Sequence, residues 1–417
     1  MNEREFFDVV ENAGGTAYLV GGAVRDEIMG RRSSDRDYVV CGIDEEDFRV
    51  FLPDAVRVGR IFPVYLADID GEKCEIAFAR KEIKNGTGYK GFAVEYSRET
   101  TIYDDLFRRD TTMNSIAKDG NGKIIDPYGG TRDIKDRVIR ATSEHFREDP
   151  IRALRTARQA AQFEFEIEEK TIRMMEQCGE ELEHEPKERK FRELERAMAA
   201  DHPSLYFINL HRAGLLAKEF PWIFDLIGKT QLADVHPEGD AFEHTMKVLD
   251  AAACRSKSLT IRFAALMHDI GKGRTPKELL PLHTGHEEIG AKMLREICAR
   301  LGVPKKWRDA AEFAAKEHAS IRHFRDAARI RDIIRTMENK KISRELLSVI
   351  TLADSGGKVP EFIKYYDALL KIIKCAAECE IPPSLAGAQI GAFLRAGEID
   401  AVERSDIFIN FIKTESA

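Results

Sequence analysis

Tyr18-Leu-Val-Gly-Gly-Ala-Val-Arg-Asp26, followed by Arg32-Ser-Ser-Asp35-Arg-Asp37-Tyr-Val-Val40, is the stretch that decides the fold of the N-terminal part of the chain. Its apolar start predicts a short buried strand that ends at Val20. The Gly21-Gly22 pair predicts a tight turn, and residues 23–29 predict a helix. A strand, a glycine turn and a helix N-terminus together present backbone N–H groups to an anion.

Charged residues in the same stretch indicate which anion this is. Arg25 lies in the first helical turn and can add a fixed positive charge to a phosphate. Asp35 and Asp37 are two residues apart in a predicted strand, which places both carboxylates on one face. Such a pair can hold two divalent ions against a triphosphate, as phosphoryl transfer requires. Each feature alone is common on turns and strand ends, but the ordered set predicts a Mg²⁺-dependent nucleotide site.

Composition limits the class of protein. The 417 residues carry a net charge of −7, and 43% of them are hydrophobic, which is enough for several globular domains. The seven cysteines are scattered and odd in number, which favours reduced thiols. No apolar run has the length of a membrane span, and the polar N-terminus does not resemble a signal peptide. We expect a cytoplasmic protein without a membrane partner; its oligomeric state is not encoded in any pattern that we recognise.

The periodicity of the chain changes near residue 140. Before that point, strands are predicted over residues 18–20, 37–41, 64–69, 74–79 and 123–125. Beyond Thr142, apolar residues recur at helical spacing. The prediction is an α+β protein with a small α/β head that contains a mixed sheet, followed by an elongated all-α body. Four parts are expected: a catalytic head at 1–140, a helical neck at 141–225, a further domain at 226–360 and a helical tail at 361–417.

Two arginine-rich segments add candidates for nucleotide contacts. Arg108-Arg109-Asp110 is predicted to open a helix and to offer two guanidinium groups. In the neck, Glu148-Asp149 precedes Arg152, Arg155 and Arg158, whose spacing places them close to one helical face. Asp and Arg side chains can satisfy the hydrogen-bonding edge of a base. A solvated helix face is the alternative for each segment.

Two further features of the head are predicted near this site. The polar, glycine-rich segment Arg80–Gly91 predicts a mobile loop, with a surface hairpin as the alternative. Glu75, on the strand just before it, is a candidate third carboxylate near the metal ions.

In their order along the chain, these motifs resemble those of the class II, bacterial-type tRNA nucleotidyltransferases, the CCA-adding enzymes and their poly(A) polymerase relatives. The matching segments are Leu19–Asp26 with Asp35 and Asp37, Arg108–Asp110, Asp126–Asp133, Glu148–Arg152 and Glu188–Leu194. The resemblance covers roughly the first 220 residues. It implies a polymerase-β-like head that binds CTP and ATP and extends the 3′ end of tRNA.

The resemblance also implies roles for single residues. Asp35 and Asp37 would hold the catalytic Mg²⁺ ions, and Gly22 and Arg25 would hold the triphosphate. The nucleotide-binding arginines of the family are matched by Arg109, Arg155 and Arg158. Asp149 and Arg152 match the pair that selects C and then A without a nucleic-acid template.

A second set of chemistry-bearing residues lies in the body. It comprises four histidines and two aspartates in segments predicted to be helical: His244, His268, Asp269, His286, His318 and Asp354. Imidazole and carboxylate groups on facing helices suit one or two transition-metal ions such as Ni²⁺, Co²⁺, Mn²⁺ or Fe²⁺. The order of these residues, with the adjacent His268-Asp269, resembles the HD-domain phosphohydrolases. It extends the resemblance to about residue 360 and implies a metal-dependent cyclic phosphodiesterase and phosphatase activity.

RNA contacts are expected from local basic groups, because the whole chain is acidic. Segment 322–345 holds eight positive and four negative residues, and Lys187, Arg189, Lys190 and Arg192 form a second group. Either group can bind phosphates of a tRNA acceptor arm. Solvated helix faces are an equal alternative for segment 322–345.

The leading prediction is a tRNA nucleotidyltransferase that adds or repairs the 3′-terminal CCA from CTP and ATP, with a second phosphohydrolase activity. Poly(A) polymerase is an alternative that the acidic composition disfavours. A partial enzyme that adds only CC or only A is a second alternative. CC-adding members of the family lack part of the loop at residues 80–91, which is intact in this sequence and so favours full CCA addition. An HD phosphohydrolase with a degenerate head is disfavoured by the presence of Asp35, Asp37 and Arg109. A non-catalytic RNA-binding protein is the last alternative.

Overall fold

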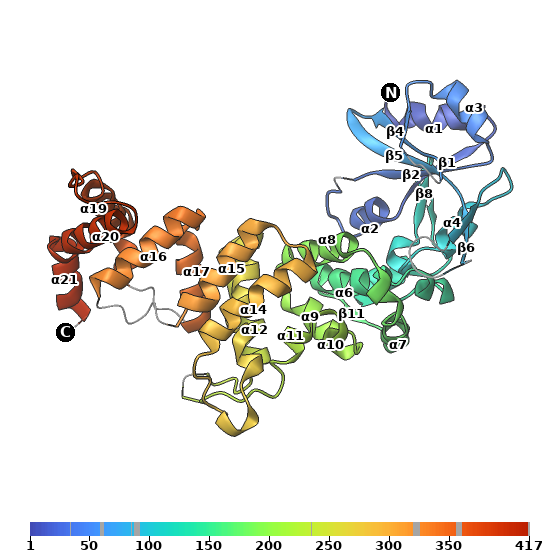
Figure 1. Ribbon diagram of the computed structural model, residues 1–417. Coiled ribbons are helices and arrows are strands. Elements are labelled where there is room, and N and C mark those ends of the chain that lie inside the picture. Colours follow the sequence, from blue (N-terminus) through green and yellow to red (C-terminus); the bar gives the residue numbers. More distant parts are fainter. Residues whose placement is uncertain are drawn as a thin grey trace. The chain divides into compact units, whose positions relative to one another are not determined.

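The computed structural model describes residues 1–33, 35–58, 62–84, 86, 92–234, 236–319, 326–355 and 361–415. The chain forms two compact units (Figure 1). The first comprises Met1–Ala197 and Leu205–Glu219, and the second comprises Met198–Ser204 and Phe220–Ala417. Among the helices of the described residues, none is both long enough and apolar enough to cross a bilayer.

A seven-stranded mixed sheet organises the first unit, in the order β3-β4-β5-β2-β1-β8-β9. Its strands are β1 (Thr16–Val20), β2 (Asp37–Cys41), β3 (Val56–Arg57), β4 (Val64–Ile69), β5 (Glu72–Phe78), β8 (Ala117–Asp119) and β9 (Ile124–Ile125). The β2–β5 pair is parallel, and the other neighbours in the sheet are antiparallel. The α+β fold class and the five predicted strands are confirmed; β3 and β8 were not predicted, because two or three residues carry too little periodicity.

The register of the sheet brings three strand positions into one row. Val20, the last residue of β1, lies opposite Asp37, the first residue of β2, and Asp37 lies opposite Glu75 on β5. The turn that follows β1, the aspartate pair and Glu75 are therefore neighbours at one edge of the sheet. The predicted proximity of Glu75 to Asp37 follows from this register.

In the described residues of the first unit, α-helices lie before, between and after the strands. They are α1 (Glu3–Asn12), α2 (Gly22–Ile28), α3 (Glu45–Phe51), α4 (Ile102–Phe107), α5 (Gly130–Asp136), α6 (Ile151–Phe163), α7 (Glu169–Gln177), α8 (Lys187–Met198), α9 (Ser204–Arg212), whose first residue belongs to the second unit, and α10 (Leu216–Glu219). Helix α4 packs on the sheet through Ile102 and Leu106, against Val20 and Val39.

The segment Arg108-Arg109-Asp110 does not open a helix, which corrects the prediction. Helix α4 begins earlier, at a capping box in which Thr101 and Asp104 bond each other's backbone N–H. It ends at Phe107, and Arg108 is its C-cap. The Thr101–Asp104 cap is the stronger helix start, because it satisfies two N–H groups at once.

Four short strands form two small sheets outside the main one. They are β6 (Lys81–Lys84) with β7 (Phe92–Glu95), which are antiparallel, and β10 (Val138–Ile139) with β11 (Glu166–Ile167), which are parallel. Part of the segment predicted as a mobile loop, Arg80–Gly91, is therefore the first strand of a hairpin, the alternative that the sequence left open. Residues 85 and 87–91 lie outside the described part of the chain.

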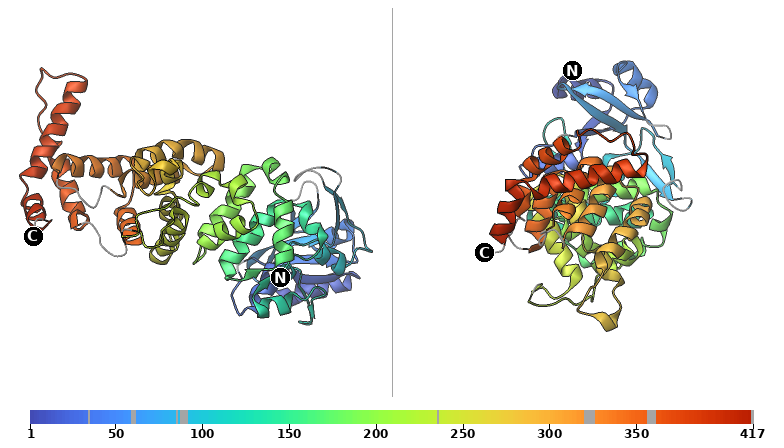
Figure 2. Two further views of the ribbon diagram at one scale, coloured as in Figure 1. Left: turned by 90° about the horizontal axis from the view of Figure 1, so that it is seen from below. Right: turned by 60° about the vertical axis from the view of Figure 1, so that its left-hand side comes forward.

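The second unit is helical. Its helices are α11 (Pro221–Phe224), α12 (Ala241–Arg255), α13 (Leu259–Met267), α14 (His286–Leu301), α15 (Lys305–Glu317), α16 (Ala327–Lys340), α17 (Arg344–Ser355), α18 (Glu361–Lys364), α19 (Tyr366–Ala376), α20 (Ala388–Glu403) and α21 (Asp406–Glu415). Figure 2 shows the chain from two further directions. A continuous apolar core joins α12, α13 and α15 to α16, α17 and α19. The loops and helix ends around α12, α13 and α15 carry most of the histidines predicted as metal ligands.

Candidate functional site

A pocket of about 460 Å³ lies in the first unit, next to the glycine turn after β1. Its lining holds eight arginines and three carboxylates, together with Gly21, Gly22, Asn114 and Gln159. The charged residues are Arg25, Arg80, Arg108, Arg109, Arg152, Arg155, Arg158 and Arg196, with Glu82, Asp110 and Asp149. Five of these arginines also pair with Asp26, Asp105 or Glu193, which lie outside the lining, and the eight arginines still outnumber the six carboxylates around them in a chain whose net charge is −7. The pocket is therefore built for a polyanion.

Gly21 is the point at which the backbone and an arginine of the pocket come closest. Its φ is +66°, and a Cβ atom at this position would lie 2.8 Å from Nη1 of Arg109. Glycine is required for both reasons, because other residues avoid this φ and a side chain would displace the guanidinium. The absence of a side chain at Gly21 thus leaves room for the Arg109 guanidinium in the pocket.

A buried carboxylate holds the two arginines that follow α4. Asp105 is fully buried; its Oδ1 accepts hydrogen bonds from Arg108, and its Oδ2 accepts from Nε and Nη2 of Arg109 at 3.1 and 2.9 Å. Burial alone would raise the pKa of Asp105, but the two guanidinium groups outweigh it and lower the pKa to about 2. Asp105, which the sequence reasoning missed, therefore fixes both cations in position.

Arg25 is held on three sides. Its Nη1 donates to Oδ1 of Asn114 at 2.6 Å, and Nε and Nη2 donate to Oδ1 of Asp26. The guanidinium carbon lies 4.5 Å from the centre of the Phe163 ring. Arg25 is thus preorganised beside Gly22, whose backbone also lines the pocket.

The predicted metal-binding carboxylates lie at the edge of the sheet. Asp35 and Asp37 are both exposed. Desolvation and the negative charges of Glu75 and Asp35 raise the pKa of Asp37, while Arg109 opposes this shift. Within the described residues, no group of three metal-binding atoms that lie within 4.8 Å of one another includes either aspartate. The carboxylates at this edge do not form a closed set of ligands. They form a cluster of negative charge that a cation would neutralise.

The neck arginines belong to one ion-pair network on α6 and α8. Glu193 pairs with Arg158 at 2.9 Å and with Arg155 at 3.4 Å, and Arg155 also reaches Oδ2 of Asp110 at 3.4 Å. Asp110 also accepts from Asn114 and from the backbone N–H of Thr111, and its pKa falls to about 2 despite its burial. Glu193 and Asp110 therefore aim these arginines; both were missed as functional candidates, since isolated acidic residues carry no signal.

Asp149 and Arg152 both line the pocket, but each has another partner. Nη2 of Arg189 donates to the carboxylate of Asp149 at 3.1 and 3.3 Å. Arg152 is buried, donates from Nη1 to the carbonyl oxygen of His145 at 2.7 Å and lies 3.7 Å from Glu82. The two side chains therefore do not satisfy each other through any contact that we find in the described residues, and polar edges of both are held at the pocket wall.

The second unit brings the six predicted metal-binding residues into one buried cluster. Asp269 lies at its centre: Oδ1 is 3.2 Å from Nε2 of His286 and 3.1 Å from Nε2 of His318. Oδ2 is 3.2 Å from Nε2 of His268 and 3.6 Å from Nε2 of His244. The sixth residue, Asp354, lies 3.1 Å from Nε2 of His244.

Nε2 of each of the four imidazole rings faces Asp269, and a contact at Nδ1 fixes the orientation of the ring. Nδ1 of His268 contacts the carbonyl oxygen of Ala265, and Nδ1 of His286 contacts that of His283. Nδ1 of His318 contacts the carbonyl oxygens of Ala314 and Ala315. The Nδ1 of His244 contacts the carboxylate of Glu238. An acceptor at Nδ1 places the proton there and leaves Nε2 with a free lone pair facing the cluster, which is the form that binds a metal ion.

The cluster fits a divalent metal ion. Within the described residues, Nε2 of His268, Nε2 of His286 and the carboxylate oxygens of Asp269 are buried and face one another, together with His244, His318 and Lys272, at ion-pair distances without well-formed hydrogen bonds. A cation at the centre would satisfy buried polar atoms that the side chains satisfy poorly among themselves. Imidazole nitrogens and carboxylate oxygens that converge in this way are the donor set of transition metals.

Charges around the cluster keep both aspartates ionised. Burial opposes ionisation, but the charges of His268 and Lys272 hold the pKa of Asp269 well below its usual range. Hydrogen bonding to His244 likewise lowers the pKa of Asp354. Lys272, 2.6 Å from Oδ2 of Asp269, is buried and also donates to Gln231. The residues that the sequence reasoning missed here are His236, Glu238 and Lys272; the first two lie in a segment interpreted only as a helix break.

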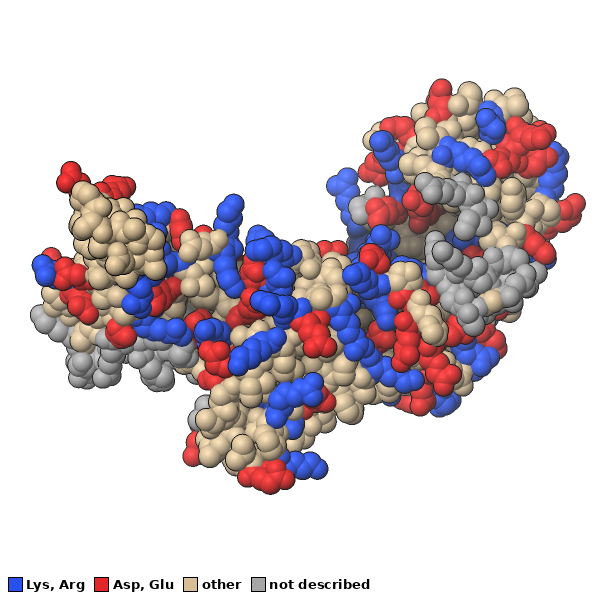
Figure 3. All heavy atoms as spheres, viewed as in Figure 1, with Lys and Arg blue, Asp and Glu red and all other residues tan. Residues whose placement is uncertain are grey.

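The two basic groups expected to bind RNA are largely neutralised within the chain. In segment 322–345, five residues pair with carboxylates: Arg329 with Glu317, Arg331 and Arg335 with Glu398, Lys340 with Glu312 and Arg344 with Asp367. Arg322 and Arg325 lie outside the described residues. Arg189 and Lys190 of the neck group pair with Asp149 and Glu219. Figure 3 shows basic and acidic side chains intermingled on the visible face.

Three protein-family models match the chain in succession. Residues 17–140 match the poly A polymerase head domain, and residues 164–226 match the probable RNA and SrmB-binding site of polymerase A. Residues 241–355 match the HD domain.

Curated relatives match most of the chain. The multifunctional CCA protein of an Acidovorax species is 39% identical over 411 residues, which covers 92% of this chain and 95% of that protein. The multifunctional CCA protein of Cupriavidus necator is 45% identical over 315 residues, or 73% of this chain and 75% of that protein.

Solved structures of CCA-adding enzymes share the fold. The Bacillus stearothermophilus enzyme in complex with CTP is 22% identical, with a TM-score of 0.69 over 99% of this chain and 96% of that one. The Thermotoga maritima enzyme complexed with tRNA is 21% identical, with a TM-score of 0.63 over 99% of this chain and 94% of that one.

Proposed function

The chain belongs to the multifunctional CCA protein family of tRNA nucleotidyltransferases, and we propose on this basis how its two centres divide the chemistry. The pocket of the first unit transfers CMP and AMP from CTP and ATP to the 3′ end of tRNA and so builds the terminal CCA. The histidine cluster of the second unit hydrolyses phosphoesters. The observation that carries the first assignment is the pocket of eight arginines beside the row of Val20, Asp37 and Glu75.

Binding of the triphosphate follows from the fixed positive charges of the pocket. Arg25 and Arg109 stand on either side of the glycine turn, each held by a carboxylate that prevents it from moving toward solvent. Gly21 and Gly22 let the phosphates approach the backbone at this point. Because these groups are in place before substrate arrives, they need little reorganisation as charge develops on the phosphates.

In the transfer itself, the tRNA 3′-hydroxyl attacks the α-phosphate and pyrophosphate leaves. Asp35 and Asp37 would hold Mg²⁺, which activates the attacking oxygen and neutralises the leaving group. Their exposed position at the edge of the sheet leaves room for both the triphosphate and the RNA end. The surplus positive charge of the pocket then offsets the charge of the departing pyrophosphate.

Selection of the base falls to Asp149 and Arg152. Both offer planar hydrogen-bonding groups at the pocket wall, and Arg189 holds Asp149 from behind. A site that pairs with the edge of a base rejects bases that leave its groups unsatisfied. Arg155 and Arg158, aimed by Glu193, supply further contacts to the nucleotide.

For the second unit we propose a transition-metal centre that the four histidines, Asp269 and Asp354 would hold. His244, His268 and Asp354 lie on the side of Oδ2, and His286 and His318 lie on the side of Oδ1. A metal ion held there would polarise a phosphoryl group and lower the pKa of a bound water. The imidazole-rich donor set favours Ni²⁺, Co²⁺, Mn²⁺ or Fe²⁺ over Mg²⁺, and the substrates are cyclic or terminal phosphoesters.

The proposal also covers the parts of the chain and its location. Head, neck, HD domain and tail are assigned to residues 1–140, 141–225, 226–360 and 361–417. The tRNA acceptor arm is the macromolecular partner. All seven cysteines are free, which supports a reducing, cytoplasmic location.

One assay tests the leading function. The purified protein is incubated with tRNA that ends at the discriminator base, with CTP, ATP and Mg²⁺, and the 3′ ends are sequenced. We expect C, C and A to be added in that order and addition to stop there. Long A tails would favour a poly(A) polymerase, and products that end after CC, or an A added only to tRNA-CC, would indicate a partial enzyme.

A further inference from the structure

We propose that His236 is an additional metal ligand of the histidine cluster, supplied by the loop before α12. This inference rests on the proposed metal centre. His236 lies outside the segment that matches the HD domain, 241–355, and outside the set of six residues that the sequence pattern predicts. The consequence is that the metal site extends beyond the HD domain into the connection that precedes it.

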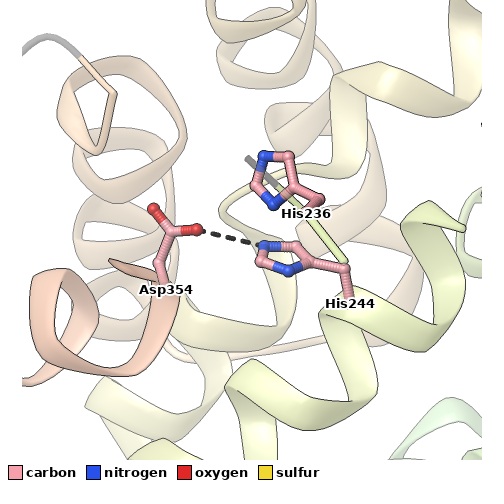
Figure 4. A group of neighbouring side chains, drawn as sticks. All are labelled: His236, His244 and Asp354. Carbon is pink, nitrogen blue, oxygen red and sulfur yellow. Dashed lines mark hydrogen bonds and ion pairs between the residues drawn. The ribbon is translucent and has the colours of Figure 1, made fainter. Parts of the chain in front are cut away.

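The position of His236 fits a ligand of the ion next to Asp354. One ligand atom each from His236, His244 and Asp354 lie within 4.8 Å of one another, and the His236 and His244 rings are 4.4 Å apart between centres. Atoms that bind one metal ion at about 2.1 Å each lie no more than about 4.2 Å from one another, so this grouping is close to the spacing of a shared ion. Figure 4 shows the three side chains converging from the loop, α12 and α17.

The bonding of His236 distinguishes it from a structural histidine. Neither of its ring nitrogens takes a hydrogen bond from the described residues, although the ring is only partly exposed. An imidazole whose nitrogens have no protein partner, next to a carboxylate and a second imidazole, completes a donor set for a transition-metal ion.

His283 is the matched counterexample in the same unit. Its ring centre lies 6.4 Å from that of His286, yet both of its nitrogens are occupied. Nδ1 contacts the hydroxyl of Thr275 at 2.8 Å, and Nε2 contacts the carbonyl oxygen of Thr230 at 3.0 Å. His283 therefore ties loops together and has no lone pair directed at the cluster.

Cobalt binding tests the proposal. The full-length protein is stripped of metal, and Co²⁺ binding is followed by visible absorption and equilibrium dialysis in excess Mg²⁺, which occupies the head. His236→Ala is compared with the wild type, with His283→Ala and with the blank His268→Ala/Asp269→Ala. CCA addition by each variant reports that the chain is folded.

We expect His236→Ala to bind Co²⁺ at least about tenfold more weakly and with an altered spectrum, because one donor is lost. Added imidazole should return the spectrum toward that of the wild type, and His283→Ala should match the wild type throughout. Unchanged affinity and spectrum in His236→Ala, or equal losses in both single variants, would overturn the assignment of His236 alone. A wild type that binds no more Co²⁺ than the blank would overturn the metal centre itself and the inference with it.

Discussion

The two centres of this protein handle phosphate chemistry with opposite distributions of charge. The head pocket surrounds its substrate with arginines, and its candidate metal-binding carboxylates, Asp35 and Asp37, are exposed. The histidine cluster buries its carboxylates, with Asp269 only 1% exposed, and surrounds them with imidazole rings and Lys272. Under the proposed function, the head would bind a charged substrate that brings metal with it, whereas the cluster would hold its ions through protein ligands.

This difference predicts different metals. Carboxylate oxygens at an open edge suit Mg²⁺, which keeps several of its waters and binds together with phosphates. Imidazole nitrogens in a closed site suit transition metals and exclude most solvent. Removing one centre should therefore leave the other working, and four predictions test how far this independence holds.

The largest effect is expected from Asp37→Ala. Loss of this carboxylate removes a ligand of the head metals and with it several kcal/mol of transition-state stabilisation, at least about a hundredfold in rate. Phosphoester hydrolysis by the second unit should stay at the wild-type level. The measurement is single-turnover CCA addition in Mg²⁺ beside hydrolysis of 2′,3′-cyclic AMP in Ni²⁺ or Co²⁺, and normal CCA addition would refute the role of Asp37.

The reciprocal variant, His268→Ala/Asp269→Ala, should lose hydrolysis across a panel of metals while CCA addition persists. Asp269 contacts all four imidazoles of the cluster, so that no arrangement of the remaining residues replaces it. Hydrolysis in the parent protein should depend on the transition metal supplied. A double variant that retains full hydrolysis would place that activity elsewhere in the chain.

A smaller effect is expected inside the head, from Asp149→Ala and Arg152→Ala. Each change removes one side of a satisfied base edge, which costs about 1–3 kcal/mol, or about fivefold to 150-fold in discrimination. Triphosphate binding should change less, because Arg25 and Arg109 are untouched. Kinetics with CTP, ATP, GTP and UTP separate the two effects, and unchanged discrimination in both variants would make the pair structural.

The smallest effect concerns the stability of the first unit in acid. The pKa of Asp110 is about 2 in the folded protein and about 3.9 in an unfolded chain. Its ionised form therefore stabilises the fold fully above about pH 4, and this contribution is lost as the pH falls toward 2. Asp110→Asn should cost about 2 kcal/mol at pH 7 and should weaken the acid dependence.

A control on the surface completes this test. Asp8, which pairs with Arg4 in an exposed position, can be changed to Asn with an expected effect within about 0.5 kcal/mol. Thermal unfolding between pH 2 and 7 is the measurement. If the stability of the wild type and of Asp110→Asn falls equally as the pH is lowered, the arginine and amide partners of Asp110 do not stabilise its ionised form.

Much of the fold and of both candidate sites could be predicted from local patterns. The strand over Asp37–Cys41 and the glycine turn depend on neighbouring residues only, and so do the adjacent His268 and Asp269. The order of the histidines and aspartates in the sequence also predicted that they would form one cluster. His244 and Asp354 meet there although more than a hundred residues separate them in the chain.

The residues that sequence reasoning missed share one property. Asp105, Glu193 and Glu238 do not belong to a repeated pattern, and each acts by holding another side chain in place. Their roles depend on distances between segments, which only the folded chain defines. The misplaced helix start at Arg108 has a local cause instead, since the capping box of Thr101 and Asp104 starts the helix earlier and Arg108 ends it.

The way the imidazole rings are oriented affects how the second centre can change during evolution. Three of the four rings are oriented by main-chain carbonyls, which every residue type supplies, so substitutions at Ala265, His283 or Ala314 preserve these contacts as long as the backbone keeps its course. His244 alone relies on a side chain, Glu238. Core packing still limits Ala265 and Ala314, but no particular side chain is needed there to hold the rings, whereas a single heritable change at Glu238 is enough to release the fourth.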